Sequence, residues 1–287
     1  MLLSLFTRRY LILVGTALSL ALALLSGCAT SPYQPEAKQK SDLLLDEQLR
    51  QASTAIAADA KSRILYAGFG MHSQSRVFRN DVLSVEQKLK QIDPNLISIR
   101  LNNPALGDPS DWPYATQENI ERVLAQLSAM ARPQDKVVVL FSSHGNKGII
   151  GINAAAQDFK SLSPTWINRA SAGLRGKPTV FLVSSCYSGS FLPEIAGPSR
   201  IVLTASAADR SSFGCNFYST KTFFIEALTA PRDYSNLSLK QLVEQTKQSI
   251  SAKEAALKLT PSLPQNSVGS AAQSWFEQPM GQWLKSP

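Results

Sequence analysis

Residues 179–191 read T-V-F-L-V-S-S-C-Y-S-G-S-F, and the run changes abruptly from apolar to small polar residues. Its first part, 179–183, carries no charge and is rich in β-branched and apolar side chains, which is typical of a strand covered on both faces of a parallel sheet. Cys186 follows this run, with Gly189 shortly after it. In open α/β sheets, ligands bind beyond the carboxyl ends of the strands, so Cys186 lies where such proteins house their chemistry.

A second stretch has the same form. Residues 136–141, K-V-V-V-L-F, predict another buried strand, and Ser142-Ser143-His144-Gly145 follows it. Two predicted strands therefore each end in one reactive side chain, and a cysteine with a histidine is the minimum set for thiolate catalysis. A histidine at a strand end is more often a surface residue, but the pattern shared by the two stretches favours a catalytic His144. His72, in the loop after the first predicted strand, has no such setting and is interpreted as structural.

The other apolar patterns alternate between strands and helices along the chain. This alternation predicts an α/β fold with a mostly parallel sheet wrapped by helices on both faces. Residues 258–287 are predicted to be irregular, and residues 145–151 are predicted to form a glycine-bearing loop. The predicted strands are 64–67, 96–101, 136–141, 179–183 and 200–205. The predicted helices are 42–58, with Ser41 or Asp42 as N-cap, 81–92, 116–130, 164–174, 220–228 and 239–257.

Length and composition fit one substantial α/β domain. The chain has 287 residues, of which 44% are hydrophobic and 17% charged, as in ordinary globular proteins. Its net charge is +8, or +6 without Arg8 and Arg9, which lie in a segment expected to be removed. The basic residues are scattered, which argues against a nucleic-acid groove. Motifs for a serine-hydrolase elbow, a zinc site or a nucleotide-binding loop are absent, so no metal and no cofactor is expected.

Residues 1–27 have the pattern of a secretory signal peptide, with a positive start, an apolar run and small residues before Cys28. The apolar run is only slightly shorter than a membrane span, so an uncleaved transmembrane anchor is the alternative. The ending L-S-G-C resembles the lipobox of bacterial lipoproteins, in which the cysteine is lipidated and becomes the new N-terminus. With Ala29 next, the resemblance implies an outer-membrane lipoprotein of the bacterial cell envelope that faces the periplasm. The predicted divisions are 1–27, signal peptide; 28–41, lipidated tether; and 42–287, folded domain.

Two cysteines remain once Cys28 is lipidated, namely Cys186 and Cys215. In an oxidising periplasm such a pair can simply be a disulfide, which would remove the nucleophile. A free Cys186 thiol is favoured over this alternative, because otherwise the Ser-Ser-His-Gly segment around His144 would have no explanation.

Several segments together resemble the legumain family of cysteine peptidases (peptidase C13), especially its bacterial members. Legumains are relatives of caspases, and the resemblance covers nearly all of the mature domain. It implies a caspase-like three-layer sandwich with a central, mostly parallel six-stranded sheet. The segments that carry it are Val138–Gly145, Val183–Phe191, Thr204–Cys215, Gly68–Gly70 and Val77-Phe78.

By position in this resemblance, His144 and Cys186 are the catalytic dyad. His144 favours the Cys186 thiolate, the thiolate attacks a peptide carbonyl, and His144 then protonates the leaving amine. The backbone N–H groups of Gly145 and Cys186 are expected to form the oxyanion hole. The resemblance also implies a specificity pocket lined near Arg79, Ser184, Ser211 and Glu226.

Legumains are known for cutting after asparagine and, less often, aspartate. An asparagine side chain needs both a donor and an acceptor in its pocket, which an Arg–Glu pair supplies. This chain departs from the animal and plant enzymes at two positions. Ser184 stands where they carry a carboxylate, and Val77 stands where they carry an asparagine near the dyad.

The sequence therefore predicts a lipid-anchored cysteine endopeptidase that acts on peptides or proteins through an acyl-enzyme. Transpeptidation, in which an amine replaces water on the acyl-enzyme, fits the same residues. The alternative from another class is a non-catalytic envelope lipoprotein that uses the fold as a binding or scaffolding module. The presence of both His144 and Cys186 favours the enzyme, because a scaffold needs neither. No nucleic-acid partner is expected.

Overall fold

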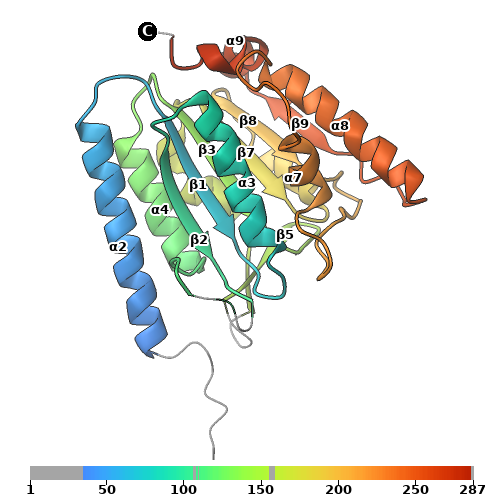
Figure 1. Cartoon of the computed structure of the whole chain (residues 1–287), viewed down its shortest axis with the longest axis horizontal. Helices are drawn as coiled ribbons and strands as arrows, with labels where there is room; N and C mark the ends of the chain where they lie inside the picture. Colours follow the sequence, from blue (N-terminus) through green and yellow to red (C-terminus); the bar gives the residue numbers. More distant parts are fainter. Residues whose placement is uncertain (1–34, 106–107, 109, 155–158, 286–287) are drawn as a thin grey trace, which may run out of the picture.

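The computed structural model describes residues 35–105, 108, 110–154 and 159–285. Its centre is a six-stranded sheet in the order β2-β1-β3-β7-β8-β9, with helices on both faces (Figure 1). The first five strands in this order run parallel and β9 is antiparallel to β8, which confirms the predicted α/β fold. The strands are β1 Ile64–Gly70, β2 Ile97–Asn102, β3 Lys136–Ser142, β7 Thr179–Ser184, β8 Arg200–Thr204 and β9 Gln265–Val268.

The helices divide between two hydrophobic clusters, one on each face of the sheet. Several of them begin at a side-chain cap, as Thr116, Ser163 and Thr222 each accept a hydrogen bond from a backbone N–H in the first turn. On one face lie α2 Pro35–Ala57, α4 Gln117–Met130, α5 Pro164–Ala170 and α6 Leu192–Ile195. On the other lie α3 Val77–Ile92, α7 Phe223–Leu228, α8 Leu239–Ala256 and α9 Gln273–Glu277.

Two regions predicted to be irregular contain strands. β9 lies in the C-terminal region and is the edge strand of the sheet. It is only partly buried, and its sequence Q-N-S-V has no apolar run. The predicted glycine loop after β3 is part of a small antiparallel sheet. Its strands are β4 Gly145–Asn146, β5 Ile149–Asn153 and β6 Phe159–Leu162.

Several predicted boundaries differ from the structure. Helix α3 begins at Val77 instead of residue 81, and α7 begins at Phe223 instead of residue 220. Helix α2 begins at Pro35, so Ser41 is not its N-cap but lies within it, where its hydroxyl accepts the Tyr114 N–H at 2.8 Å. The last residues of the predicted tether are therefore helical. β1 runs on through Gly68 to Gly70, because these residues still pair with β2 and β3. Gly68 leaves room for α3, since a Cβ there would lie 2.6 Å from Val82 Cγ1.

The signal peptide and the lipidation site at Cys28 lie outside the described residues. Within the described part of the chain, no helix combines the length and the hydropathy that crossing a bilayer requires.

Asp81 on α3 is completely buried and joins the ends of β3 and β7 to the start of α7. Ser142 Oγ donates to its Oδ2 at 2.6 Å, and Thr222 donates to both oxygens, through Oγ1 at 2.9 Å and through N–H at 3.1 Å. Thr222 Oγ1 also lies 2.9 Å from Ser184 Oγ. Because Ser142 and Ser184 are the last residues of β3 and β7, one carboxylate fixes where both strands end. Burial raises the pKa of Asp81 to about 7 despite its three donors.

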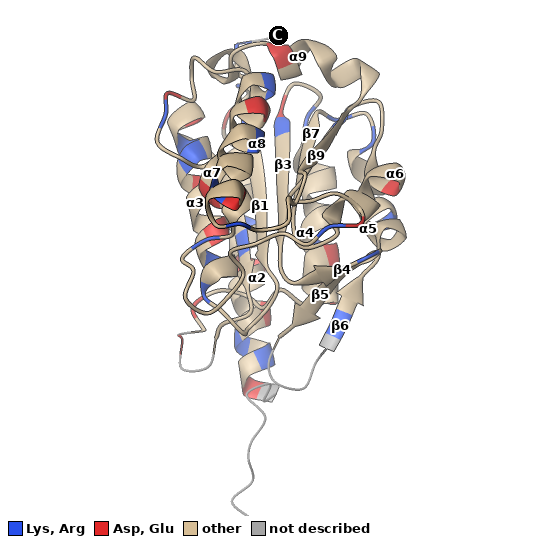
Figure 2. Cartoon of the chain, turned by 90° about the vertical axis from the view of Figure 1, so that its right-hand side faces the viewer, with Lys and Arg blue, Asp and Glu red and all other residues tan. Residues whose placement is uncertain are grey.

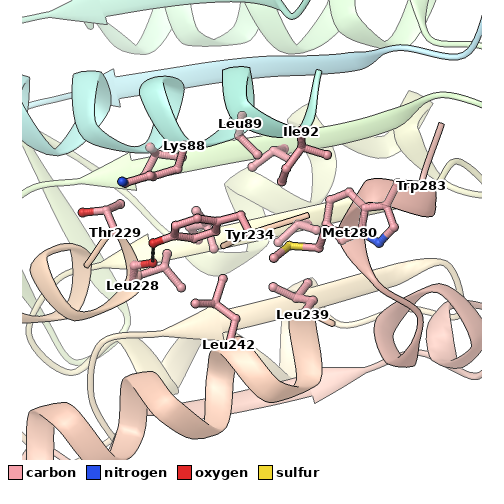
Figure 3. Close-up of a pocket in the computed structure, with 14 residues that line it drawn as sticks. Lys88, Leu89, Ile92, Leu228, Thr229, Tyr234, Leu239, Leu242, Met280 and Trp283 are labelled. Carbon is pink, nitrogen blue, oxygen red and sulfur yellow. Dashed lines mark hydrogen bonds between the residues drawn. The ribbon is translucent and has the colours of Figure 1, made fainter. Parts of the chain in front are cut away.

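A cavity of about 50 Å³ lies between α3, α8 and the C-terminal segment (Figure 3). Its walls are mostly aliphatic and aromatic, including Val138 and Val180 from the sheet and Leu242 from α8. Ligand sites usually measure about 300 Å³ or more, so this cavity is a packing gap.

Replacing Asp81 by asparagine is expected to flatten the pH dependence of stability. The folded-state pKa of about 7 lies above the ordinary value of 3.8, so between these values the folded state binds the proton more tightly and stability falls as the pH rises. In Asp81→Asn this fall, on the order of a few kcal/mol, is absent. Urea unfolding at about pH 4 and about pH 8 measures the difference.

Asp111→Asn is the control for that measurement. Asp111 is largely exposed, and its hydrogen bond with Arg79 lowers its pKa, so its charge hardly changes over the range and its effect on stability should be nearly constant. Equal pH slopes for the wild type and Asp81→Asn would contradict a titrating Asp81.

Val138→Ile is expected to stabilise the protein, because the added methylene enters the cavity and gains up to about 0.8 kcal/mol. Val139 is the matched control: it packs on the opposite face of β3 and does not line the cavity. Val139→Ile should cost about 1–3 kcal/mol through overpacking. Urea unfolding measures the stability of both variants. Equal changes in the free energy of unfolding would show that the cavity does not admit the methylene.

Candidate active site

The carboxyl ends of β3 and β7 lie side by side, and each carries one of the two predicted catalytic residues. Ser142 pairs in register with Ser184, and the Ser143 N–H donates to the Ser184 carbonyl at 3.2 Å. His144 and Cys186 each follow two residues after these paired serines. The structure therefore brings both residues to the same edge of the sheet, as the two sequence stretches predict.

A sharp turn follows Cys186. Tyr187 has φ +57°, in the left-handed region that non-glycine residues rarely occupy. Its N–H donates to the Arg210 carbonyl at 2.8 Å, and the Gly189 N–H donates to the Ser206 carbonyl at 2.9 Å. Such a conformation persists only where its surroundings fix it, and here two bonds to the segment after β8 do so. The turn leaves Cys186 projecting beyond the sheet.

The Cys186 sulfur is surrounded by hydrogen-bond donors from residues 211–215. The Ser212 N–H lies 3.3 Å from Sγ and the Ser212 hydroxyl 3.7 Å from it. The Cys215 thiol donates to Cys186, and this bond, with those from Ser212 and Ser211, lowers the pKa of Cys186 to about 6 although burial opposes the shift. The same bond, together with burial, raises the pKa of Cys215. Both cysteines are free thiols, so the disulfide considered from the sequence is not present.

His144 is half-buried against two aromatic rings. Its ring centroid lies 4.7 Å from that of His72 and 5.1 Å from that of Phe78, with interplanar angles of 88° and 79°. Its Nε2 is buried and has no hydrogen-bond partner among the residues that the structure describes. Burial lowers the pKa of His144, because the charged imidazolium loses solvation.

Gly145 contacts the end of β7 directly. A Cβ at this position would lie 2.8 Å from Ser185 Oγ and 2.9 Å from the Cys186 carbonyl oxygen, so only glycine fits. The Gly151 N–H donates to the His144 carbonyl at 2.8 Å, which makes Gly145 and Ile150 the next, non-hydrogen-bonded pair of the antiparallel ladder. The Gly145 N–H therefore points away from β5.

The four residues predicted for the specificity pocket have different contacts in the structure. Ser211 contacts Cys186, and Ser184 lies beneath it in the buried Asp81 network. Arg79 forms two hydrogen bonds with Asp111, at 2.7 and 3.0 Å, and stacks on Trp112 beside the edge strand β2. Glu226 is half-exposed on α7 and pairs with Lys253 at 2.6 Å. The joint role of Arg79 and Glu226 in a specificity pocket stays a prediction, and in the structure each of them pairs with another residue of opposite charge.

Two residues of the site had no predicted role in it. The sequence offered Cys215 only as a disulfide partner and His72 only as a structural residue. A signal for His72 was available, since it follows β1, which neighbours β3 in the sheet. For Cys215, the serines at 211 and 212 beside it were the only sign of a polar loop.

Charged residues of both signs are intermixed along the helices and loops in Figure 2, without a continuous band of one sign. Among the described residues, no cluster of three or more His, Cys, Asp or Glu side chains is arranged to hold a metal ion. The chemistry that the site itself offers is that of the thiol and the imidazole.

Similarity to known proteins extends to a solved structure and to a protein family. Among solved structures, the crystal structure of caspase-1 from Spodoptera frugiperda is similar, with a TM-score of 0.49 and 14% identity over 72% of this chain and 85% of that one. No curated protein sequence matches the chain. The sequence model of the peptidase C13 family matches residues 118–274, which contain both His144 and Cys186 and make up more than half of the chain. The chain therefore belongs to the peptidase C13 family, as the legumain resemblance predicts.

Proposed function

We propose that this protein is a cysteine endopeptidase in which Cys186 is the nucleophile and His144 the general base and acid. One observation carries the proposal: in a chain of the peptidase C13 family, a cysteine of lowered pKa and a histidine end two adjacent parallel strands. Neighbouring strand ends are where such a pair can exchange a proton over a short distance.

The thiolate is stabilised mainly by neutral donors. Hydrogen bonds from Cys215 and Ser212 lower the pKa of Cys186, so the sulfur ionises without needing a permanently charged His144. The thiolate attacks the peptide carbonyl and a C–S bond forms. The Gly145 N–H, directed away from β5, and the Cys186 N–H then donate to the developing oxyanion.

His144 transfers the proton between the Cys186 thiol and the leaving amine. It takes the proton of the Cys186 thiol and returns it to the leaving amine as the C–N bond breaks. Water then cleaves the thioester, with His144 accepting its proton. An amine in place of water would give transpeptidation by the same route.

The substrate is a peptide or a protein. The legumain resemblance favours asparagine or aspartate before the scissile bond, and the Ser211 hydroxyl is near enough to Cys186 to contact that residue. Phe217 and Tyr218, on the loop after Cys215, are 79% and 95% exposed and give the substrate chain an aromatic surface. The signal-peptide pattern of residues 1–27 supports a lipid anchor at Cys28 and a location at the outer membrane, facing the periplasm.

The proposal is tested with residues 29–287, an activity-based probe and peptides that vary the residue before the scissile bond. Cys186→Ala and His144→Ala are expected to abolish labelling and cleavage, while the control Ser249→Ala, on the exposed face of α8, retains both. If no peptide is cleaved and no probe reacts, the binding or scaffolding alternative is favoured.

Activity is expected to peak in mildly acidic solution. The productive state holds one proton between Cys186 and His144, and the pKa of both is lowered, that of Cys186 to about 6. Below this range the thiolate is lost, and above it the proton needed by the leaving amine is lost. The pH profile of kcat/KM should be bell-shaped with its maximum near pH 6, and a plateau extending to about pH 9 would contradict this assignment.

Cys215→Ala is expected to raise the pKa of Cys186 toward its ordinary value, because the strongest donor to the thiolate is lost. Cys215→Ser keeps a donor and should restore most of the effect. Site-resolved alkylation rates as a function of pH measure both variants without requiring a substrate. If the two variants and the wild type give the same profile, Cys215 does not stabilise the thiolate.

A further inference from the structure

We propose that His72 is a positioning residue for His144, closing the Nε2 side of the imidazole and leaving Nδ1 as the nitrogen that exchanges a proton with Cys186. The inference rests on the proposed peptidase function, which assigns His144 as general base and acid. It adds a residue from a third strand end to the two that carry the reaction.

The backbone around His72 is fixed on both sides. His72 forms a parallel β-bridge with Asn153 at the end of β5, the Ser73 N–H donates to the Asn153 carbonyl at 3.1 Å, and the Asn153 N–H donates to the Met71 carbonyl at 2.8 Å. These bonds tie the segment after β1 to the hairpin that begins at His144. The His72 ring is therefore held against His144 by the fold rather than by chance contact.

Two rings pack closely on His144. His72 comes from the segment after β1 and Phe78 from the first turn of α3, and both stand nearly perpendicular to the His144 ring. In the proposal, these two rings are what buries Nε2, which has no partner among the described residues. For Nδ1 to exchange a proton with Cys186, the second imidazole proton stays on Nε2 in both the neutral and the charged form. The charged form loses more solvation in this setting, which lowers the pKa of His144. The same packing denies water and other proton acceptors access to Nε2.

His72 suits this role because it stays uncharged. Its Nδ1 accepts the Gln74 N–H at 3.2 Å, so its proton is on Nε2. Burial and the proximity of His144 lower the pKa of His72 to about 4, well below the range in which the dyad would work. Among the described residues, the titratable groups that this argument places near His144 are His72, from the segment after β1, and Cys186, from the end of β7. Phe78 of α3 and Gly151 of β5 carry no charge.

The chain has only two histidines, so each His72 variant leaves His144 as the single imidazole in an NMR titration. In His72→Ala, water reaches Nε2, and the pKa of His144 should rise toward its ordinary value of 6.5. The basic limb of the kcat/KM profile should move to higher pH with it, and kcat should fall about ten- to a hundredfold with KM unchanged. In His72→Phe, which keeps an aromatic wall, the pKa of His144 and the profile should remain as in the wild type.

Gln74→Ala is the matched control, since it alters the exposed neighbour and leaves the backbone N–H to His72 in place. If His72→Ala does not fold, His72→Asn serves instead, because its side-chain oxygen can still accept the Gln74 N–H while the ring is gone. An unchanged pKa of His144 in the truncated variant would overturn the proposal. So would a His72→Phe variant that behaves like the truncated one.

The NMR readout needs no turnover, so two failures can be told apart. The expected pKa pattern without cleavage by any variant overturns the peptidase function and leaves the enclosure of His144 standing. Cleavage with a pKa that does not respond to His72→Ala overturns the role of His72 alone.

Discussion

The site depends on the parallel pairing of β3 with β7, in which Ser142 lies opposite Ser184. This register sets the relative height of His144 and Cys186, and a slip by one residue would send one of the two side chains to the opposite face. Asp81 stabilises this register, because it is hydrogen-bonded to Ser142 directly and to Ser184 through Thr222. A carboxylate buried in this way destabilises the fold above its ordinary pKa, and such a cost is typical of residues that serve a functional site.

Much of the fold could be predicted from the sequence, because the four interior strands have apolar runs and the edge strand β2 alternates between apolar and polar residues. β7 is the clearest case, with an uncharged run that stops where the polar turn begins. The sixth strand, β9, was implied only by the family resemblance. Its residues are polar because an edge strand is half-covered, and its partner β8 lies more than sixty residues earlier in the chain, so no local pattern marks it.

The candidate site, like the fold, could be predicted only in part. The positions of His144 and Cys186 followed from strand ends, which parallel sheets always bring together. The contacts of His72 and Cys215 did not, because they arise between segments that are distant in sequence and have no periodicity. The specificity pocket stays a prediction for a related reason. Arg79 and Glu226 pair with Asp111 and Lys253, and only the folded arrangement shows which opposite charge lies near each of them.

The antiparallel pairing of β9 with β8 limits where the chain can be truncated. β8 is buried along its whole length, and β9 supplies the hydrogen bonds that its outer side would otherwise lack. A truncation before residue 265 would leave an apolar strand with a row of free amides and carbonyls, which invites pairing between molecules and aggregation. An affinity tag therefore belongs after residue 285, with the whole C-terminal segment retained.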